Sequence, residues 1–407
     1  ELTFHLEEGN RILCRTRCVS GRPFDQLSGL CVKLEADSSE HAARLRDVLG
    51  QIRYNARCCA VDRRAGAFLD ENEILEDQDA EEIEKYQEFV PMFEKMRELS
   101  ELLRKNRHAR GSIDFDFPEA KIILDKKGKP VDIRPYEANT ATKIIEDFML
   151  LANETVASEY FWQEIPFVYR THEAPDSDKI KKLDTFIHNF GYYMKTGRES
   201  FHPKEIQKLL FSLEGEPEEP LISRLALRSM KQAKYTTLNV GHFGLSTQYY
   251  THFTSPIRRY PDLFIHRIIS NYLENKYNVS DEFKNEYKAK AEQRATSSSD
   301  REKIATKVER ESEDIKKAEY MENKVGEEYE GIVSSVTQFG IFVELENTVE
   351  GLIRFENLGN EYFIYDEERK RLIGERTNTT YKIGDKVKIR VISANKMLRQ
   401  IDFEIVK

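Results

Sequence analysis

The sequence predicts an α+β protein in which a helix-rich region with short strands is followed by a small closed β-barrel. Two observations carry this prediction. Apolar residues recur at helical spacing in several segments from residue 81 onward, and from residue 326 the pattern changes to the two-residue alternation typical of strands. A length of 407 residues, with 39% hydrophobic and 33% charged residues, suits two to four folded domains.

The helix-rich region begins with a long amphipathic helix expected over residues 81–111, which ends in basic residues followed by Gly111. The next segment, 112–137, alternates apolar and polar residues around a turn and predicts a hairpin. The further helices expected in this region span 140–160, 176–190, 202–213, 221–235 and 262–277. A long charged helix is expected over 281–323, with a break at 297–299.

The barrel is expected over about the last 75–80 residues, where short alternating strands are separated by turn glycines. Phe339, Phe342 and Phe355, with Tyr362 nearby, are expected to place rings on one exposed face of its sheet. Nucleobases stack on such rings at ~1–3 kcal/mol each, which makes these residues candidates for RNA binding. A small barrel or sandwich without any ligand is the alternative.

Charge is distributed unevenly along the chain. The net charge of −9 excludes a uniformly basic nucleic-acid binder, so a polyanion site must be local. Residues 221–261 hold no Asp or Glu, although about seven would be expected by chance. The cations of this segment are Arg224, Arg228, Lys231, Lys234, Arg258 and Arg259. Cations cleared of acids favour a phosphate backbone. The alternatives are chance composition, or acid partners from elsewhere in the fold.

Spacing places part of these cations together. Arg224, Arg228 and Lys231 lie at i, i+4 and i+7 of the helix expected over 221–235, with Lys234 slightly round the same face. They are therefore expected to form one basic stripe that follows a phosphate backbone, although such stripes are often only solvated surface.

The first 72 residues differ in composition from the rest. They contain ten Arg and one Lys, against 21 Arg and 31 Lys afterwards, and they hold all five cysteines. The cysteine spacing fits neither a zinc site nor an ordinary disulfide framework, so free thiols are expected. This Arg- and Cys-rich segment is predicted to end at a domain boundary near residue 72.

Several motifs in the remaining chain resemble one family. The run GHFGLSTQYYTHFTSPIRRYPDLFIHR is similar to the signature of the RNase II/ribonuclease R (RNB) family of 3′→5′ exoribonucleases. The segments LISRLALRSMKQAKY, RHARGSIDFDFPEAKI and ATKIIEDFMLLANETVA are similar to the same family. The barrel resembles an S1-type RNA-binding domain of the five-stranded OB class, including residues 331–343. The resemblance implies an RNB core, a mixed sheet with many helices, over 73–324 and an S1 barrel over 325–407, with residues 1–72 outside it.

The resemblance also implies an activity and residue roles. Enzymes of this family hydrolyse single-stranded RNA from its 3′ end and release nucleoside 5′-monophosphates with Mg²⁺. Arg258 corresponds to the arginine that stabilises charge at the scissile phosphate, and Glu146 to a glutamate near the 3′-terminal nucleotide. Arg259 and Tyr260 belong to the same RNA-contacting turn, which Asp262 helps to fix. The residues expected along the path of the strand are Arg224, Arg228 and Lys231. The alternatives are that Arg258 is a structural arginine bonded to carbonyls and that Glu146 is simply a surface residue of an amphipathic helix.

The chain departs from the family pattern in its acidic residues. The family holds Mg²⁺ with several aspartates inside a window of about ten residues, since this hard ion takes oxygen ligands. No such cluster is found here. The nearest acidic run, 70–84, offers Asp70, Asp77 and Asp79 as weak metal candidates, and acids before a helix are explained equally by its macrodipole. An active exoribonuclease and a catalytically inactive RNA-binding protein therefore both remain open.

The remaining expectations concern location and partners. No apolar run approaches the ~20 residues that span a bilayer, and the acidic start does not resemble a signal peptide, so a cytoplasmic protein without membrane contact is expected. The chain does not begin with Met, so a longer parent protein is expected. Single-stranded RNA is the expected partner. An association with ribosomes or mRNA decay, and a monomeric state, are further expectations.

Overall fold

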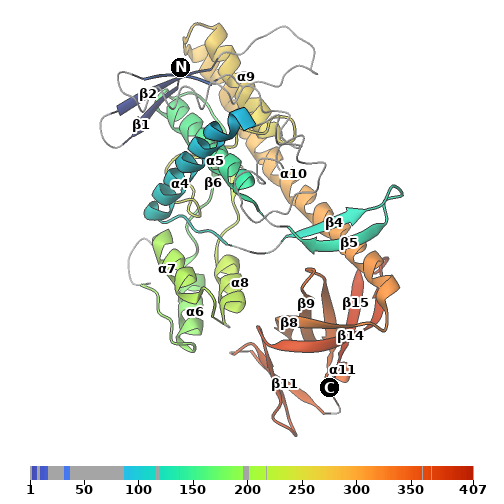
Figure 1. Cartoon of the computed structure of the whole chain (residues 1–407). Coiled ribbons are helices and arrows are strands. Elements are labelled where there is room, and N and C mark those ends of the chain that lie inside the picture. Colours follow the sequence, from blue (N-terminus) through green and yellow to red (C-terminus); the bar gives the residue numbers. More distant parts are fainter. Residues whose placement is uncertain are drawn as a thin grey trace. The chain divides into compact units, whose positions relative to one another are not determined.

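The computed structural model describes residues 2–6, 10–16, 32–36 and 87–406, the last range with gaps at 116, 118, 137, 196–200, 217, 360 and 368. The chain divides into two compact units, each built from separate stretches of sequence (Figure 1). Unit 1 comprises Glu1–Ser112, Ala138–Glu173 and Ala233–Ser299. Unit 2 comprises Ile113–Glu137, Ala174–Gln232 and Asp300–Lys407.

Unit 1 is mainly helical. Its strands form a three-stranded antiparallel sheet and a separate antiparallel pair, namely β1 (Leu2–Leu6), β2 (Asn10–Thr16), β3 (Val32–Ala36), and β6 (Tyr169–Thr171) with β7 (Lys234–Thr236). Its helices are α4 (Val90–Arg110), preceded by the 3-10 turn η3 (Gln87–Phe89), α5 (Thr140–Trp162), α9 (Tyr260–Glu274) and the first part of α10 (Asp281–Met321).

The ends of α4 and α5 follow from local sequence. Gly111 ends α4 in the left-handed conformation (φ 104°), and its N–H bonds back to the carbonyls of Arg107 and His108, which confirms the expected stop. Asn139 caps α5, because its side-chain oxygen accepts a hydrogen bond from the Thr142 N–H at 2.9 Å. Residues 81–86 of the expected first helix lie outside the described residues.

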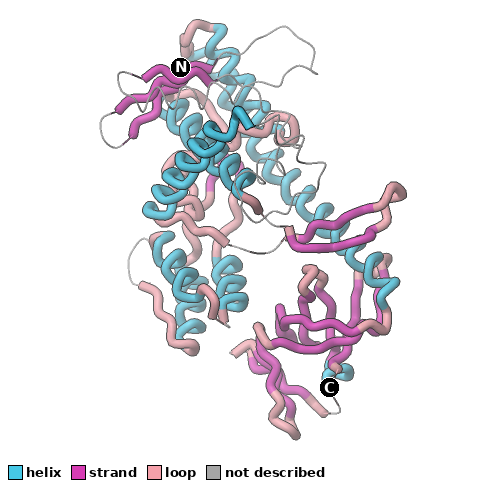
Figure 2. The backbone as a smooth tube through the Cα atoms, in the orientation of Figure 1, coloured by secondary structure: helices cyan, strands magenta, loops and turns pink. Residues whose placement is uncertain are grey.

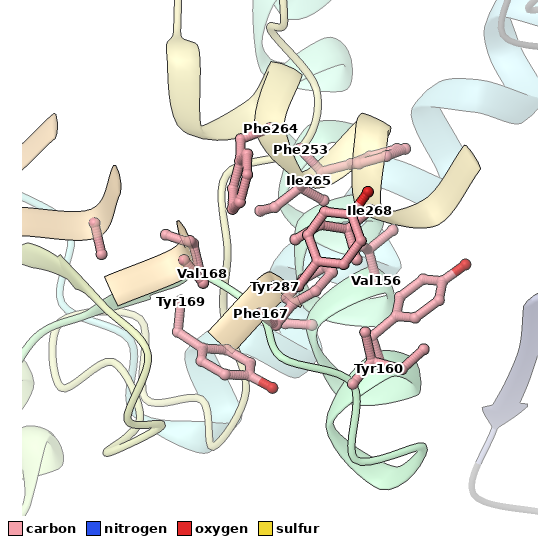
Figure 3. Close-up of a cluster of buried hydrophobic side chains, with 14 of the residues drawn as sticks. Val156, Tyr160, Phe167, Val168, Tyr169, Phe253, Phe264, Ile265, Ile268 and Tyr287 are labelled. Atoms are coloured by element: carbon pink, nitrogen blue, oxygen red, sulfur yellow. The ribbon is translucent and has the colours of Figure 1, made fainter. Parts of the chain in front are cut away.

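The core of unit 1 joins helices that are far apart in sequence. Figure 3 shows Val156 and Tyr160 of α5, Phe167 from the segment after it, Ile265 of α9 and Tyr287 of α10 packed into one buried cluster. Ile265 is fully buried, and the apolar face of α9 therefore fixes this helix against α5 and α10. The loop that leads into α9 is anchored to the same core through Phe253.

Unit 2 contains a hairpin, three helices that precede α10 in the chain, the end of α10 with the 3-10 turn η4 (Glu322–Lys324), and the barrel with its insertion (Figure 2). The hairpin is β4 (Ala120–Leu124) with β5 (Pro130–Pro135), and the helices are α6 (Ser177–His188), α7 (Pro203–Leu213) and α8 (Glu219–Ser229). Ile133 of the hairpin and Met321 of α10 are buried in the same apolar cluster as the barrel core.

The barrel confirms the expected five-stranded OB-type fold. Its closed strand order is β10-β15-β14-β8-β9, and its strands are β8 (Glu328–Thr337), β9 (Gly340–Leu345), β10 (Glu350–Arg354), β14 (Lys386–Asn395) and β15 (Gln400–Ile405). The short helix α11 (Phe355–Leu358) and a sheet of β11 (Phe363–Asp366), β12 (Arg371–Gly374) and β13 (Thr380–Lys382) are inserted between β10 and β14. Gly351 is required in β10, since an added Cβ would lie 2.4 Å from the buried ring of Phe403.

Two expected helix boundaries were wrong. The helix expected over 221–235 ends at Ser229, because Met230 turns to an extended conformation (ψ 157°) and the chain continues to Lys234, which starts β7. Lys231 and Lys234 therefore do not extend the stripe of Arg224 and Arg228. The break expected at 297–299 is absent, and α10 runs through it.

Serine is tolerated within α10 because its hydroxyl finds partners. Ser299 Oγ donates to the Ala295 carbonyl one turn earlier at 3.0 Å and accepts from the Tyr235 N–H at 2.9 Å. This contact joins α10 to β7. None of the described helices combines the length and apolar character needed to cross a membrane.

Candidate nucleic-acid interface

The TSPIRRYPD run forms a turn closed onto the start of α9. The N–H groups of Arg258 and Arg259 both donate to the Ser255 carbonyl, at 3.3 and 3.0 Å. The Ser255 N–H in turn donates to Asp262 Oδ2 at 2.8 Å. Pro261 occupies the first turn of α9, where its missing N–H costs nothing, and Asp262 follows where the helix dipole favours an acid. The turn is therefore closed at both ends by hydrogen bonds.

The two adjacent arginines of the turn have different surroundings. Arg259 Nε lies 3.1 Å from both oxygens of Asp262, and an Nη2 bond of 2.9 Å completes a forked ion pair. Asp262 is fully buried. Arg258 is exposed, beside the fully exposed Ile257, and makes no side-chain ion pair with any described residue. The turn therefore holds Arg259 inward and presents the permanent charge of Arg258 to solvent.

Tyr260 begins α9 and is 40% exposed. The guanidinium of Arg294, on α10, lies 5.5 Å from the centre of its ring. The structure thus brings Arg258, Arg259 and Tyr260 together on one turn within unit 1.

A partly buried polar cluster in the same unit contains Tyr235, His252 and Arg170. Tyr235 Oη lies 2.8 Å from His252 Nδ1, and the Arg170 guanidinium lies over the Tyr235 ring at 4.7 Å. Burial lowers the pKa of His252 to about 2, and the positive charges of Arg259, Arg170 and Arg258 act in the same direction. His252 is therefore neutral at physiological pH and acts as a hydrogen-bonding residue.

His242 is held neutral in the same way. Burial, followed by the influence of His172 and Arg170, lowers the pKa of His242 to about 3. Its ring packs edge-on against His172 at 5.1 Å and against Tyr250 at 5.1 Å. Gly244 lies close to this pair: an added Cβ would be 3.1 Å from His172 Nδ1, so the His172 ring would have to shift slightly to accept a larger residue.

These two histidines predict a pH dependence of stability. Their folded pKa values lie below the ordinary value of 6.5, so on acidification the unfolded chain takes up two protons that the folded chain does not. The contribution is fully present above pH 6.5 and is lost as the pH falls towards about 3. We expect the free energy of unfolding to drop by about 2 kcal/mol between pH 6.5 and 5.5 from this source. Urea unfolding at both pH values measures it, and an equal pH slope in a variant with both histidines replaced by Asn would contradict the assignment.

Asn153 connects α5 to the loop before the turn. Its side-chain oxygen accepts from the Phe253 N–H at 2.9 Å, and its amide donates to Tyr250 Oη at 3.3 Å. His266 stacks on the Phe253 ring at 4.2 Å and bonds the Phe253 carbonyl at 2.9 Å. Asn153, Tyr235 and Arg170 were not predicted from sequence. Only a polar residue on an otherwise apolar helix face pointed to Asn153.

Glu146 and its neighbour Asp147 face different surroundings on α5. Glu146 is exposed. Asp147 is buried and accepts hydrogen bonds from Ser100 (2.7 Å), Arg104 (2.7 Å) and Arg107 (3.2 Å) of α4. Asp147 therefore joins α4 to α5, while Glu146 is accessible to a ligand.

Most cations of the acid-free segment have acid partners from elsewhere in the sequence. In unit 2, Arg224 pairs with Glu344 of the barrel and donates to the Ser334 carbonyl at 3.3 Å. The other pairs are Lys231 with Asp176 at 3.2 Å and, in unit 1, Lys234 with Glu173 at 2.5 Å. Arg228 is exposed and makes no ion pair with a described residue. The alternative of acid partners from elsewhere in the fold therefore applies to these three cations, whereas Arg259 pairs with Asp262 just beyond the end of the acid-free segment.

The barrel aromatics do not all share one face. Phe342 lies on the outer side of β9, since Ile341 and Val343 on either side of it are buried. Phe339, in the turn before β9, is 51% exposed. Phe355 is on α11 and packs partly against the barrel core, with the Phe363 ring stacked at 6.5 Å. The expected exposed sheet face thus holds Phe342 with Phe339 beside it, because the chain leaves the sheet at α11.

Two domain families match the chain. The RNB domain model matches residues 63–275, and the S1 RNA binding domain model matches residues 322–406. The chain therefore belongs to the RNB family and carries an S1 RNA-binding domain.

Individual relatives are ribonucleases R. Ribonuclease R 1 of Lactococcus lactis is 45% identical over 322 residues, which cover 79% of this chain and 39% of that protein. Ribonuclease R of Vibrio parahaemolyticus is 37% identical over 399 residues, which cover 94% of this chain and 46% of that protein. That share of this chain is larger than the share that residues 73–407 alone make up. The chain spans less than half the length of these relatives.

A solved structure of a ribonuclease R has a similar fold. RNase R of Mycoplasma genitalium, in complex with ribose methylated single-stranded RNA, superposes with a TM-score of 0.74 at 27% identity. The match covers 85% of this chain and 52% of that chain. The similarity therefore extends over both units.

RNB family nucleases are in general metal-dependent. Within the described residues, no group of three or more His, Cys, Asp or Glu side chains is placed to hold a metal ion. Asp262, which follows the turn, has both oxygens engaged by Arg259 and Ser255. The described part of the chain does not fit a Mg²⁺ site. Asp70, Asp77 and Asp79 lie outside the described residues.

Proposed function

We propose that this chain acts as a 3′→5′ exoribonuclease of the ribonuclease R type, which degrades single-stranded RNA to nucleoside 5′-monophosphates. The observation that carries the proposal is the TSPIRRYPD turn, which presents Arg258 to solvent. The buried Asp262 holds this turn by accepting a hydrogen bond from the Ser255 N–H. The identity to ribonucleases R supports the substrate class.

Arg258 is the residue proposed to act on the scissile phosphate. A planar guanidinium donates two parallel hydrogen bonds to phosphate oxygens and stays charged throughout the reaction, so it stabilises negative charge that develops during attack by water. The exposed Glu146 is proposed to contact the 3′-terminal nucleotide. Mg²⁺ is part of the proposal as the family's cofactor, and no step is assigned to it through the described residues.

The remaining RNA contacts are divided between units. In unit 1, Arg259 and Tyr260 belong to the proposed turn. In unit 2, Arg228 is available to phosphate, whereas Arg224 and Lys231 would exchange acid partners for it. Phe339 and Phe342 are proposed to stack on bases, with Phe355 supporting them from α11.

The proposed domain limits are 73–324 for the RNB part and 325–407 for the S1 barrel, with an atypical segment before them; the RNB domain match begins inside that segment, at residue 63. A cytoplasmic, monomeric protein that acts on single-stranded RNA, alone or with ribosomes and the mRNA decay machinery, completes the proposal.

The test uses single-stranded RNA labelled at its 5′ end and incubated with the 407-residue protein, with and without Mg²⁺. Mg²⁺-dependent stepwise shortening from the 3′ end on a sequencing gel is the expected result. RNA that stays intact but shifts on a native gel would instead identify a binding protein without cleavage activity, and RNA that neither shortens nor shifts would overturn the proposal.

A further inference from the structure

Tyr260, the tyrosine of the TSPIRRYPD turn, is in contact with a cation of α10. The Arg294 guanidinium lies over the Tyr260 ring, 5.5 Å from its centre. The buried Phe264 ring, one helical turn further along α9, stacks on Tyr260 with its centre 6.4 Å away and the two planes 16° apart. A guanidinium from a distant part of the sequence is therefore placed directly beside a residue of the proposed RNA-contacting turn.

The backbone of α10 is fixed where Arg294 leaves it. Tyr287, Ala291 and Ala295 lie on the buried face of this helix, and they belong to the same apolar cluster as Phe264. Arg294 follows Ala291 by three residues but is exposed. The core of unit 1 therefore holds the Arg294 backbone in place against α9, while the side chain lies at the surface.

The positive charge of Arg294 is not balanced locally. Its guanidinium makes no hydrogen bond or ion pair with any residue that the structure describes, and its one contact is with the Tyr260 ring. The residues three and four positions away on the helix, where an acid could pair with it, are Lys290, Ala291, Ser297 and Ser298. Lys290, one turn earlier, is in contrast paired with Glu286 at 2.7 Å. Of these two cations, Arg294 is the one available to an anion.

We propose that Arg294 contacts a backbone phosphate of the RNA, with the Tyr260 ring supporting its guanidinium. The inference rests on the proposed function, because it adds a residue to the same site. A guanidinium offers paired N–H donors to phosphate oxygens, and a ring beside it limits the orientations it must give up on binding. Such a contact positions the strand at the turn without reading its sequence. The competing explanation is that Arg294 only holds Tyr260 in place.

The salt dependence of RNA binding separates the two explanations. Each phosphate contact on a single strand contributes about −0.7 to the slope of log affinity against log salt concentration. For Arg294→Ala we expect roughly tenfold weaker binding at 0.1 M salt and a slope shallower by about 0.7. Arg294→Lys keeps the charge and should keep the slope. Fluorescence anisotropy with a labelled single-stranded RNA at four salt concentrations, in EDTA to prevent cleavage, gives both numbers.

Lys288→Ala is the matched control. It removes one positive charge from an exposed position of the same helix in the same unit, about 120° round the helix from Arg294, and should change neither number. Circular dichroism confirms that each variant is folded. An Arg294→Ala protein that binds more weakly with the wild-type slope would show that Arg294 only supports Tyr260.

Two further outcomes would also overturn the inference while the proposed function stands. One is an unchanged affinity and slope in Arg294→Ala, and the other is an equal loss of slope in Lys288→Ala, which would assign the effect to net charge. The cleavage test on wild-type protein is independent of all three variants. Wild-type protein that binds no RNA would contradict both the inference and the proposed function.

Discussion

Replacing Asp262 by Ala is expected to destabilise the protein by about 3–5 kcal/mol, the usual cost of removing one partner of a buried ion pair. Asp262 is fully buried, and it accepts bonds from the Arg259 side chain and the Ser255 N–H. Alanine would leave a guanidinium and a backbone N–H without their partner. The substitution would also remove a side chain that joins Ser255 to Arg259 across the turn.

Asp178→Ala is a matched control for this variant. Asp178 also lies in the first turn of a helix, α6, but its side chain is 88% exposed. Its removal tests the helix dipole together with an exposed ion pair to Lys181 at 3.9 Å, and should cost no more than about 1 kcal/mol. Urea unfolding of both variants measures the difference. Equal costs would show that the ion pair with Arg259 contributes little and that the turn is held by its backbone.

Local patterns predicted the elements whose ends are set by neighbouring residues. The C-terminus of α4 follows from Gly111, and the alternation of Ile341 and Val343 with outward residues gave the barrel strands. The end of α8 could not be predicted from local sequence, because no residue between Ser229 and Lys234 is a helix breaker. The chain leaves the helix there since residues 234–236 pair with β6. Tertiary pairing overrode local propensity at this point.

In the candidate site, too, local sequence predicted some features and tertiary contacts determine the others. The motif located Arg258 and Arg259, but their opposite surroundings depend on Asp262 reaching back across one helical turn. The acid-free stretch suggested unpaired cations, yet Arg224 finds Glu344 at a distance of more than a hundred residues in sequence. Composition within a window cannot report such partners. For the same reason the contact of Arg170 with the Tyr235 ring, which depends on β6 lying beside β7, had no signal in the sequence.

The RNA cleavage rate is expected to fall by about 10²–10³-fold in Arg258→Ala, the usual effect of deleting one donor that stabilises transition-state charge. Because the side chain is exposed and has no ion pair with a described residue, stability should change by less than about 0.5 kcal/mol. RNA affinity should fall far less than the rate, since many other phosphate contacts remain. Single-turnover cleavage with saturating protein measures the chemical step apart from binding.

Arg258→Lys distinguishes a directed guanidinium from simple positive charge. Lysine restores the charge without the planar fork, so a rate that stays near the Ala value would assign the effect to paired hydrogen bonds on the phosphate. Recovery to near wild type would assign it to charge alone. Arg301→Ala, at an exposed position of α10, controls for the loss of net charge. If Arg258→Ala cleaves at the wild-type rate, the turn does not reach the scissile phosphate, and the assignment of this site as the point of cleavage is wrong.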